Sequence, residues 1–319
     1  MPFFLSLDRN FIDLIRIHVG YDKPDRLERV IKRLDIWHRP LMTTYFACIV
    51  ANKYKLKDAR LNGILDHCRF KNSIIANTFS DISKKLNDAG IPVLAIKGVA
   101  RRLLNNKDIR PMNDADFCVP KLDYKRAVEI AKDNGFNVMH SLYYSCDMLR
   151  GIHGAIDIHN TIFRGCSPAS DKLIWSRAQR VSGFGTDVFV PCAEDLLFIS
   201  ACDYYGDFIY SMSSGKIDLD SIAIAHPFVL PEIINSIKNN PDLDWRRVME
   251  IAEMSNAGYQ IRAIVAQIEK IHPGIITDDA KKIMAEICPD NTYKHFIARD
   301  ERIVKMYDTS RRNILRKSK

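Results

Sequence analysis

The chain has 319 residues, of which 47% are hydrophobic and 27% are charged, and its formal net charge is +8. This composition is ordinary for a soluble globular protein, and the length allows one large core or two or three smaller ones. No apolar run approaches the roughly 18 residues of a membrane span, which argues against an integral membrane protein.

The first part of the chain, residues 1–85, carries apolar residues at helical spacing. Its opening stretch, residues 1–17, includes Asp8 and has no basic leader before the apolar positions, which favours an amphipathic helix over a signal peptide. We therefore expect an N-terminal helical region over residues 1–85, in a cytoplasmic protein with no membrane partner.

The middle of the chain, residues 86–190, alternates short β-rich runs with turns and one helix. We expect the strands at residues 93–96, 115–119, 136–140, 155–159 and 188–190, and the helix at 125–135. This pattern predicts an α+β core with a small mixed sheet, although the pattern alone does not give the order of the strands.

From residue 191 onward the pattern is helical again, and prolines separate the segments. We expect helices at residues 193–205, 217–225, 231–239, 244–255, 257–271 and 277–287. The predicted organisation is therefore an N-terminal helical region, a core over residues 86–190, a C-terminal helical domain over 191–300 and a basic tail over 301–319.

The segment from Ile91 to Val119 holds a lysine–glycine turn after an apolar run. Gly98 has no Cβ, so the turn backbone can approach a bulky anion closely. A helix that begins just after it would present free N–H groups and a positive dipole end. The turn is therefore a candidate triphosphate site, with Lys97 and Arg110 as its cationic partners.

Two carboxylates follow on the next predicted strand. Asp114 and Asp116 are two residues apart, so they point to the same side of a strand. Carboxylates this close repel each other unless a cation lies between them. Divalent ions that prefer oxygen ligands meet this need, and a pair of them can hold the attacking and leaving oxygens of a phosphoryl transfer.

A third carboxylate, Asp157, lies between two isoleucines on a later predicted strand, and His159 shares its face. The three pieces each have a plain structural interpretation: a simple turn, a solvated edge strand and a structural histidine. Their order along the chain favours one site for metal-dependent nucleotidyl transfer.

Three stretches together resemble a known family: 96–98 (Ile-Lys-Gly), 110–119 (Arg-Pro-Met-Asn-Asp-Ala-Asp-Phe-Cys-Val) and 156–159 (Ile-Asp-Ile-His). They are similar to the motifs of the uncharacterised nucleotidyltransferase family, within the DNA polymerase β-like nucleotidyltransferase superfamily. The resemblance covers about residues 70–285. Asn160 stands where the family usually has Trp, and Val99 follows Gly98 where the superfamily usually has Ser or Gly.

The resemblance implies a DNA polymerase β-like nucleotidyltransferase core and a role for each matching residue. The implied catalytic and metal-binding residues are Asp114, Asp116 and Asp157, with Mg²⁺ or Mn²⁺ as the cofactor. The implied nucleotide-binding residues are Lys97, Gly98, Arg110, His159 and Lys216. For Lys216, a surface or capping role is the favoured alternative.

We expect the protein to move an NMP group from a nucleoside triphosphate to an acceptor hydroxyl with release of pyrophosphate. The acceptor stays open between a small molecule, a protein side chain and an RNA 3′ end, and a toxin or defence role stays open with it. The basic charge slightly favours RNA, but no aromatic-rich RNA-reading motif is visible. The alternative is a non-catalytic nucleotide- or partner-binding protein on the same fold, for which the residue after Gly98 is the sequence support.

Overall fold

The structure is a computed structural model of the chain, and it describes residues 9–34, 41–56, 58–104, 111–152, 154–163, 166–213 and 228–294. The chain packs as two compact units, one from Ala59 to Ile199 and one made of the residues before and after it. Several predictions lie outside the described residues: Arg110, Lys216, the helix at 217–225 and the basic tail at 301–319.

The central unit is built on a mixed sheet, which confirms the predicted α+β architecture. The strands are β1 (Leu94–Ala95), β2 (Ala115–Cys118), β3 (Asn137–Ser141), β4 (Ser145–Arg150), β5 (Gly154–His159), β6 (Gln179–Gly183) and β7 (Thr186–Val190). Within the described residues they form one seven-stranded sheet in the order β3-β4-β5-β2-β1-β7-β6. The pairs β2–β5 and β1–β7 are parallel, and the other neighbours are antiparallel.

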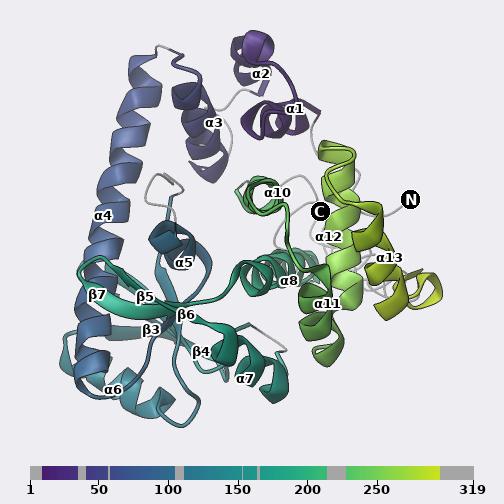
Figure 1. Cartoon of the computed structure of the whole chain (residues 1–319). Helices are drawn as coiled ribbons and strands as arrows, with labels where there is room; N and C mark the ends of the chain where they lie inside the picture. Colours follow the sequence, from purple (N-terminus) through teal and green to yellow (C-terminus); the bar gives the residue numbers. More distant parts are fainter. Residues whose placement is uncertain are drawn as a thin grey trace, which may run out of the picture. The chain divides into compact units, whose positions relative to one another are not determined.

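Five helices of the described chain belong wholly or partly to this unit. They are α4 (Ala59–Asp88), α5 (Lys97–Leu104), α6 (Tyr124–Asp133), α7 (Pro168–Arg177) and the first residues of α8 (Ala193–Ser213). Figure 1 shows α4 running along the sheet beside β5 and β7. The start of α7 is fixed locally, because Ser167 accepts a hydrogen bond from the Ser170 amide and Pro168 needs no partner for its nitrogen.

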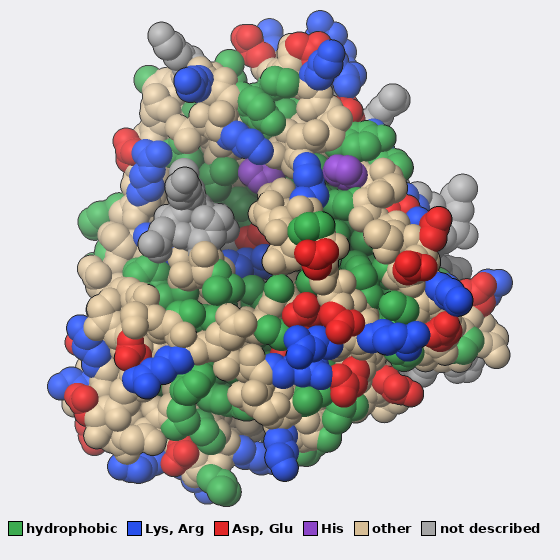
Figure 2. Space-filling view, in the orientation of Figure 1, with side chains coloured by type: hydrophobic (Ala, Val, Ile, Leu, Met, Phe, Trp, Pro, Cys, Tyr) green, Lys and Arg blue, Asp and Glu red, His purple; other side chains and the backbone are tan. Residues whose placement is uncertain are grey.

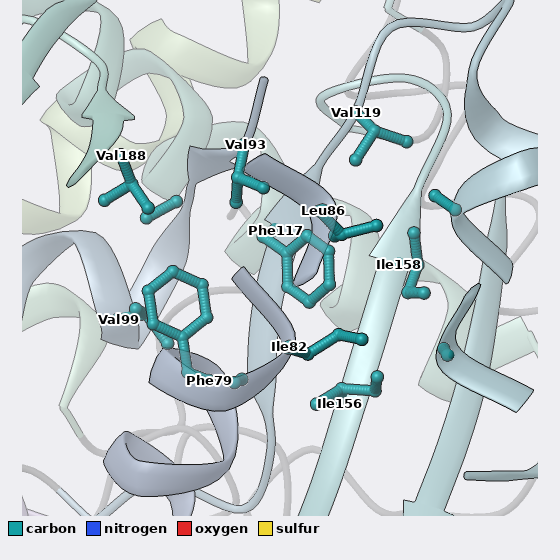
Figure 3. Packing of buried hydrophobic residues seen from close by; sticks show 14 of the residues in the cluster. Phe79, Ile82, Leu86, Val93, Val99, Phe117, Val119, Ile156, Ile158 and Val188 are labelled. Atoms are coloured by element: carbon teal, nitrogen blue, oxygen red, sulfur yellow. The ribbon is translucent and has the colours of Figure 1, made fainter. Parts of the chain in front are cut away.

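The core of the sheet unit lies between α4 and one face of the sheet. Helix α4 contributes an apolar stripe at intervals of four and three residues, which is what one face of a helix requires. Figure 3 shows this stripe against the sheet side chains, and the packed residues include Phe79, Ile82, Leu86, Phe117, Ile156 and Ile158. The rings of Phe79 and Phe117 meet edge to face with centroids 5.8 Å apart. Full burial of each such side chain contributes about 1.5–3 kcal/mol.

The second unit is helical. Its described helices are α1 (Arg9–His18), the short 3-10 helix η2 (Pro24–Arg26), α2 (Leu27–Leu34), α3 (Leu41–Lys53), the remainder of α8, α10 (Val229–Asn239), α11 (Trp245–Met254), α12 (Gly258–Ile271) and α13 (Asp278–Ile287). The predicted helices at 231–239, 244–255, 257–271 and 277–287 are confirmed to within two residues at each end. Two of them have side-chain caps, Asp244 on α11 and Thr277 on α13.

The predicted boundaries do not coincide with the packing units. Residues 59–85 were expected in the N-terminal helical region, but α4 packs with the sheet. The amphipathic pattern of a helix shows that one face is buried, but it does not show which partner buries it. The four-part division of the chain stays a prediction.

Three general features bear on the kind of protein this is. Among the described helices, none is long and apolar enough to cross a bilayer. All eight cysteines fall within the described part of the chain, and each is a free thiol. On the face shown in Figure 2, basic and acidic side chains are interspersed, so that face carries both charges.

Candidate active site

The candidate site lies on the sheet face opposite α4, where β2 and β5 run in parallel. In their register Asp116 is the partner of Asp157, and Cys118 is the partner of His159. Because side chains alternate along a strand, Phe117 and Ile158 point to the core while these residues point to the other face. The strand pairing therefore brings together an acidic pair that is about forty residues apart in the chain.

The functional atoms of this group are close together. The Nε2 atom of His159 lies 2.8 Å from Oδ2 of Asp157 and 3.4 Å from Oδ1 of Asp116. Each of the three offers a ligand atom within 4.8 Å of the others. All three residues are buried, with exposed fractions of 7% for Asp116, 9% for Asp157 and 3% for His159. We call Asp116, Asp157 and His159 the site triad.

Charge inside the triad is balanced by the histidine and a lysine. Lys97 places its Nζ atom 2.9 Å from Oδ1 of Asp116. Burial alone would raise the pKa of Asp116, but Lys97 and His159 hold that pKa well below its usual range. Burial likewise disfavours the imidazolium, but the contacts with Asp116 and Asp157 outweigh it and raise the pKa of His159 to about 9. The two carboxylates therefore favour the imidazolium form of His159.

Asp114 lies beside the triad but is not part of it. The charge of Asp116, together with burial, raises the pKa of Asp114 to about 7. The segment before β2 is held by α4, because Asn72 accepts a hydrogen bond from the Met112 amide at 2.8 Å. Asn72 is 1% exposed, so this anchor is buried. Asp114 lies one residue before β2 and Asp116 lies within it, so the two carboxylates of the expected Asp-x-Asp pair have unequal environments.

Lys97 has an unusual backbone conformation. Its φ angle is +50°, in the left-handed region that residues other than glycine rarely adopt. Helix α5 begins at Lys97, not after Gly98 as predicted, and Gly98 is its second residue. Antiparallel pairing of β1 with β2 and a hydrogen bond from the Ile96 amide to the Asp116 carbonyl place Lys97 beside the carboxylates. Strained backbone of this kind persists where surrounding structure fixes it, often at functional sites.

The sequence placed His159 on the same strand face as Asp157. In the structure His159 is also almost fully buried and contacts both carboxylates. The reason is the register: His159 lies opposite Cys118, the residue two positions after Asp116, so its ring can lean back over the carboxylate pair.

One acidic residue of this face was missed by the sequence analysis. Asp147 on β4 is the cross-strand partner of Asp157, and His140 on β3 is the partner of Asp147. Partial desolvation and the charge of Asp157 raise the pKa of Asp147 to about 6. The available signal was the alternation of buried Cys146 and Met148 around an exposed Asp147, but β4 was not predicted as a strand.

The donor set suits a divalent cation that prefers oxygen. The Oδ1 atom of Asp157 is buried and has no hydrogen-bond partner among the residues that the structure describes. A buried carboxylate oxygen without a partner is costly, and a metal ion or a substrate hydroxyl would satisfy it. Carboxylate oxygens are the ligands that Mg²⁺ and Mn²⁺ prefer.

Comparison with known proteins gives one family. A family model described as uncharacterised nucleotidyltransferase matches residues 53–271. Among solved structures, the chain is similar to the solution structure of the antibiotic-resistance factor ANT(2'')-Ia, with 16% identity and a TM-score of 0.34 over 62% of this chain and 96% of that chain. No curated protein matches the chain.

Proposed function

The chain belongs to the uncharacterised nucleotidyltransferase family, and from this premise we propose that it transfers an NMP group from a nucleoside triphosphate to an acceptor hydroxyl. The observation that carries the proposal is the site triad, with Asp114 and Lys97 beside it. A binding cleft for a nucleotide alone has no need of carboxylates on two adjacent strands. We further propose that the sheet unit is a DNA polymerase β-like core.

In this proposal Asp116 and Asp157, with Asp114, would hold Mg²⁺ or Mn²⁺. The ion would neutralise charge on the transferring phosphoryl group and orient its oxygens. Support comes from the buried Asp157 Oδ1 atom and from the repulsion that raises the pKa of Asp114, since both features are relieved by a cation.

Lys97 and the start of α5 would bind the triphosphate. The Lys97 ammonium already lies at the site, paired with Asp116. A triphosphate offers it more negative charge than one carboxylate, and the α5 amides and dipole favour an anion at the same end. Gly98, Arg110 and Lys216 stay candidate nucleotide contacts from the sequence, and the last two lie outside the described residues.

Asp157 would receive the proton of the acceptor hydroxyl. The acceptor oxygen forms a bond to the α-phosphorus, the bond from that phosphorus to the bridging oxygen breaks, and pyrophosphate leaves. General-base assistance of this kind contributes typically about 10²–10⁴-fold. His159, which contacts Asp157 and Asp116, would fix the orientation of both carboxylates.

The test is transfer of label from each of the four NTPs, α-³²P labelled, in Mg²⁺ or Mn²⁺. The acceptors are separated RNA, protein and small-molecule fractions of a cell extract. We expect label in one fraction with the parent chain and with Asp133→Asn, an exposed carboxylate at the end of α6. We expect none with Asp116→Asn. Absence of label in every fraction with the parent chain would contradict the proposal.

A binding-only protein is the second candidate, and one observation favours it. Lys97 and the His159 imidazolium already give both carboxylates of the triad cationic partners within the chain. Calorimetry that detects Mg²⁺-dependent NTP binding, together with no transfer to any fraction, would support this candidate over the enzyme.

A further inference from the structure

Polar side chains of the site form one row across four neighbouring strands. Cross-strand partners connect Asp116 on β2, Asp157 on β5, Asp147 on β4 and His140 on β3. Cβ atoms of such partners are about 4.5–5.5 Å apart in antiparallel pairs, so Asp147 reaches the same space as Asp157. Lys97 follows β1, on the other side of β2, and therefore lies at the opposite end of the row.

The two ends of this row differ in charge and in exposure. At the β1 end, the Lys97 ammonium and the start of α5 supply positive charge around buried Asp116. At the β3 end, Asp147 and His140 are both exposed, and β3 is an edge strand with every residue exposed. The triphosphate fits the cationic end, because Asp147 would repel it at the other.

The hairpin of β3 and β4, residues 137–150, is tied to the end of β5. Asn160 donates its side-chain amide to the Tyr143 carbonyl and its backbone amide to the Tyr144 carbonyl, both at 2.9 Å. The Tyr144 ring lies 6.3 Å from the His159 ring, and Tyr143 is 77% exposed. Asn160, the residue that departs from the family motif, therefore holds an aromatic hairpin tip next to the triad.

We propose, on the basis of the nucleotidyltransferase function above, that this hairpin is the acceptor side of the site and that Asp147 is a catalytic residue that binds the acceptor hydroxyl. An exposed carboxylate binds a hydroxyl through a short charge-assisted hydrogen bond. From the β3 edge, the hydroxyl reaches Asp147 first and Asp157 next. There the buried Oδ1 atom of Asp157 has no partner within the described part of the chain. His140 positions Asp147 from the neighbouring strand. The acceptor enters from solvent over the edge strand, and the nucleotide enters from the α5 side.

The experiment separates nucleotide binding from acceptor use. Calorimetry with Mn²⁺ and a non-hydrolysable α,β-methylene NTP analogue measures nucleotide binding alone. Label transfer to the fraction that the parent chain modifies depends on both nucleotide binding and use of the acceptor. For Asp147→Asn we expect analogue affinity within about 3-fold of the parent and transfer at least about 100-fold slower, with the KM for the NTP unchanged. Asp116→Asn should lose analogue binding as well.

Asp133→Asn is the matched control, because it removes an exposed carboxylate of the same unit away from the row, and it should match the parent in both assays. His140→Gln should slow transfer less than Asp147→Asn and leave analogue binding intact. Thermal unfolding should show Asp147→Asn at least as stable as the parent, since its repulsion with Asp157 is removed.

Three outcomes would overturn the proposal. Unchanged transfer by Asp147→Asn would exclude the role directly. If Asp147→Asn lost analogue binding to the same extent as Asp116→Asn, Asp147 would belong to the residues that bind the metal and the nucleotide, and not to the acceptor site. Analogue binding by a parent chain that labels no fraction would contradict the transferase function, and the acceptor role would fail with it.

Discussion

The two faces of β2 and β5 are both buried, but one is apolar and the other carries charged side chains. On one face Phe117, Ile156 and Ile158 are at most 1% exposed and pack against α4. On the other, Asp116 and Asp157 are nearly as buried, and they depend on Lys97 and His159 for compensating charge. The first arrangement gives stability. The second contributes little net stability, because burying charged groups costs about as much as their pairing returns. Its carboxylates and cations are groups that a ligand can bind.

The largest expected effect concerns the polar face. Asp157→Asn should reduce nucleotidyl transfer by about 10²–10⁴-fold, because it removes the proposed base and a metal ligand. The amide has the same shape and His159 keeps its contact with Asp116, so the unfolding midpoint should fall less than it does for a core variant. Single-turnover label transfer and thermal unfolding measure the two quantities. A large loss of stability would show that this face, too, holds the fold together.

A substitution on the core face of the same strands should reduce stability more than it reduces nucleotidyl transfer. Phe117→Ala removes a fully buried ring that contacts Phe79, and we expect it to cost about 3–5 kcal/mol of unfolding free energy. Urea denaturation measures this cost. If the variant stays folded under assay conditions, its transfer rate should fall far less than that of Asp157→Asn. An equal fall would contradict the assignment of catalysis to the polar face and of stability to the core face.

A divalent ion should raise the unfolding free energy by binding to the polar face, and a substitution on the core face should not change this increment. Mn²⁺ at about 100 times its Kd should add about 2.7 kcal/mol to the unfolding free energy by mass action. The increment should survive in Val188→Ala, a core-face variant on β7, and should disappear in Asp116→Asn. An equal increment in Asp116→Asn would place the ion elsewhere. Differential scanning calorimetry in Mn²⁺ and in EDTA makes the comparison.

The smallest effect is a dependence of stability on pH. The pKa of Asp114 is raised from 3.8 to about 7, so between these values the folded state binds more protons than the unfolded state. Stability in EDTA should therefore fall as pH rises through this window. Asp114→Asn should remove that part of the slope and raise stability near pH 7, because the folded state no longer holds a carboxylate against the charge of Asp116. Urea midpoints at several pH values test this, and an unchanged slope would refute it.

The amino-acid sequence by itself determined which side of each strand is polar. Asp114 and Asp116 share a face, and Asp157 and His159 share another, because alternation along a strand is local and needs no knowledge of its neighbours. The same local logic located five helices, α6 and α10 to α13, to within two residues at each end. It failed for β6, whose residues are exposed or half-buried without a clear alternation, and for β4, whose start follows a turn-like Tyr143-Tyr144 pair.

Only the tertiary structure decided how these faces meet. The pairing of Asp116 with Asp157 depends on strand register across about forty residues of chain, and the pairing of Asp157 with Asp147 depends on the register of two consecutive strands, β4 and β5. The burial of His159 between two carboxylates also depends on this register. The left-handed backbone of Lys97 and the packing of α4 on the sheet are likewise products of contacts distant in sequence. Local pattern shows which residues share a face, and long-range hydrogen bonding between strands selects which faces become one site.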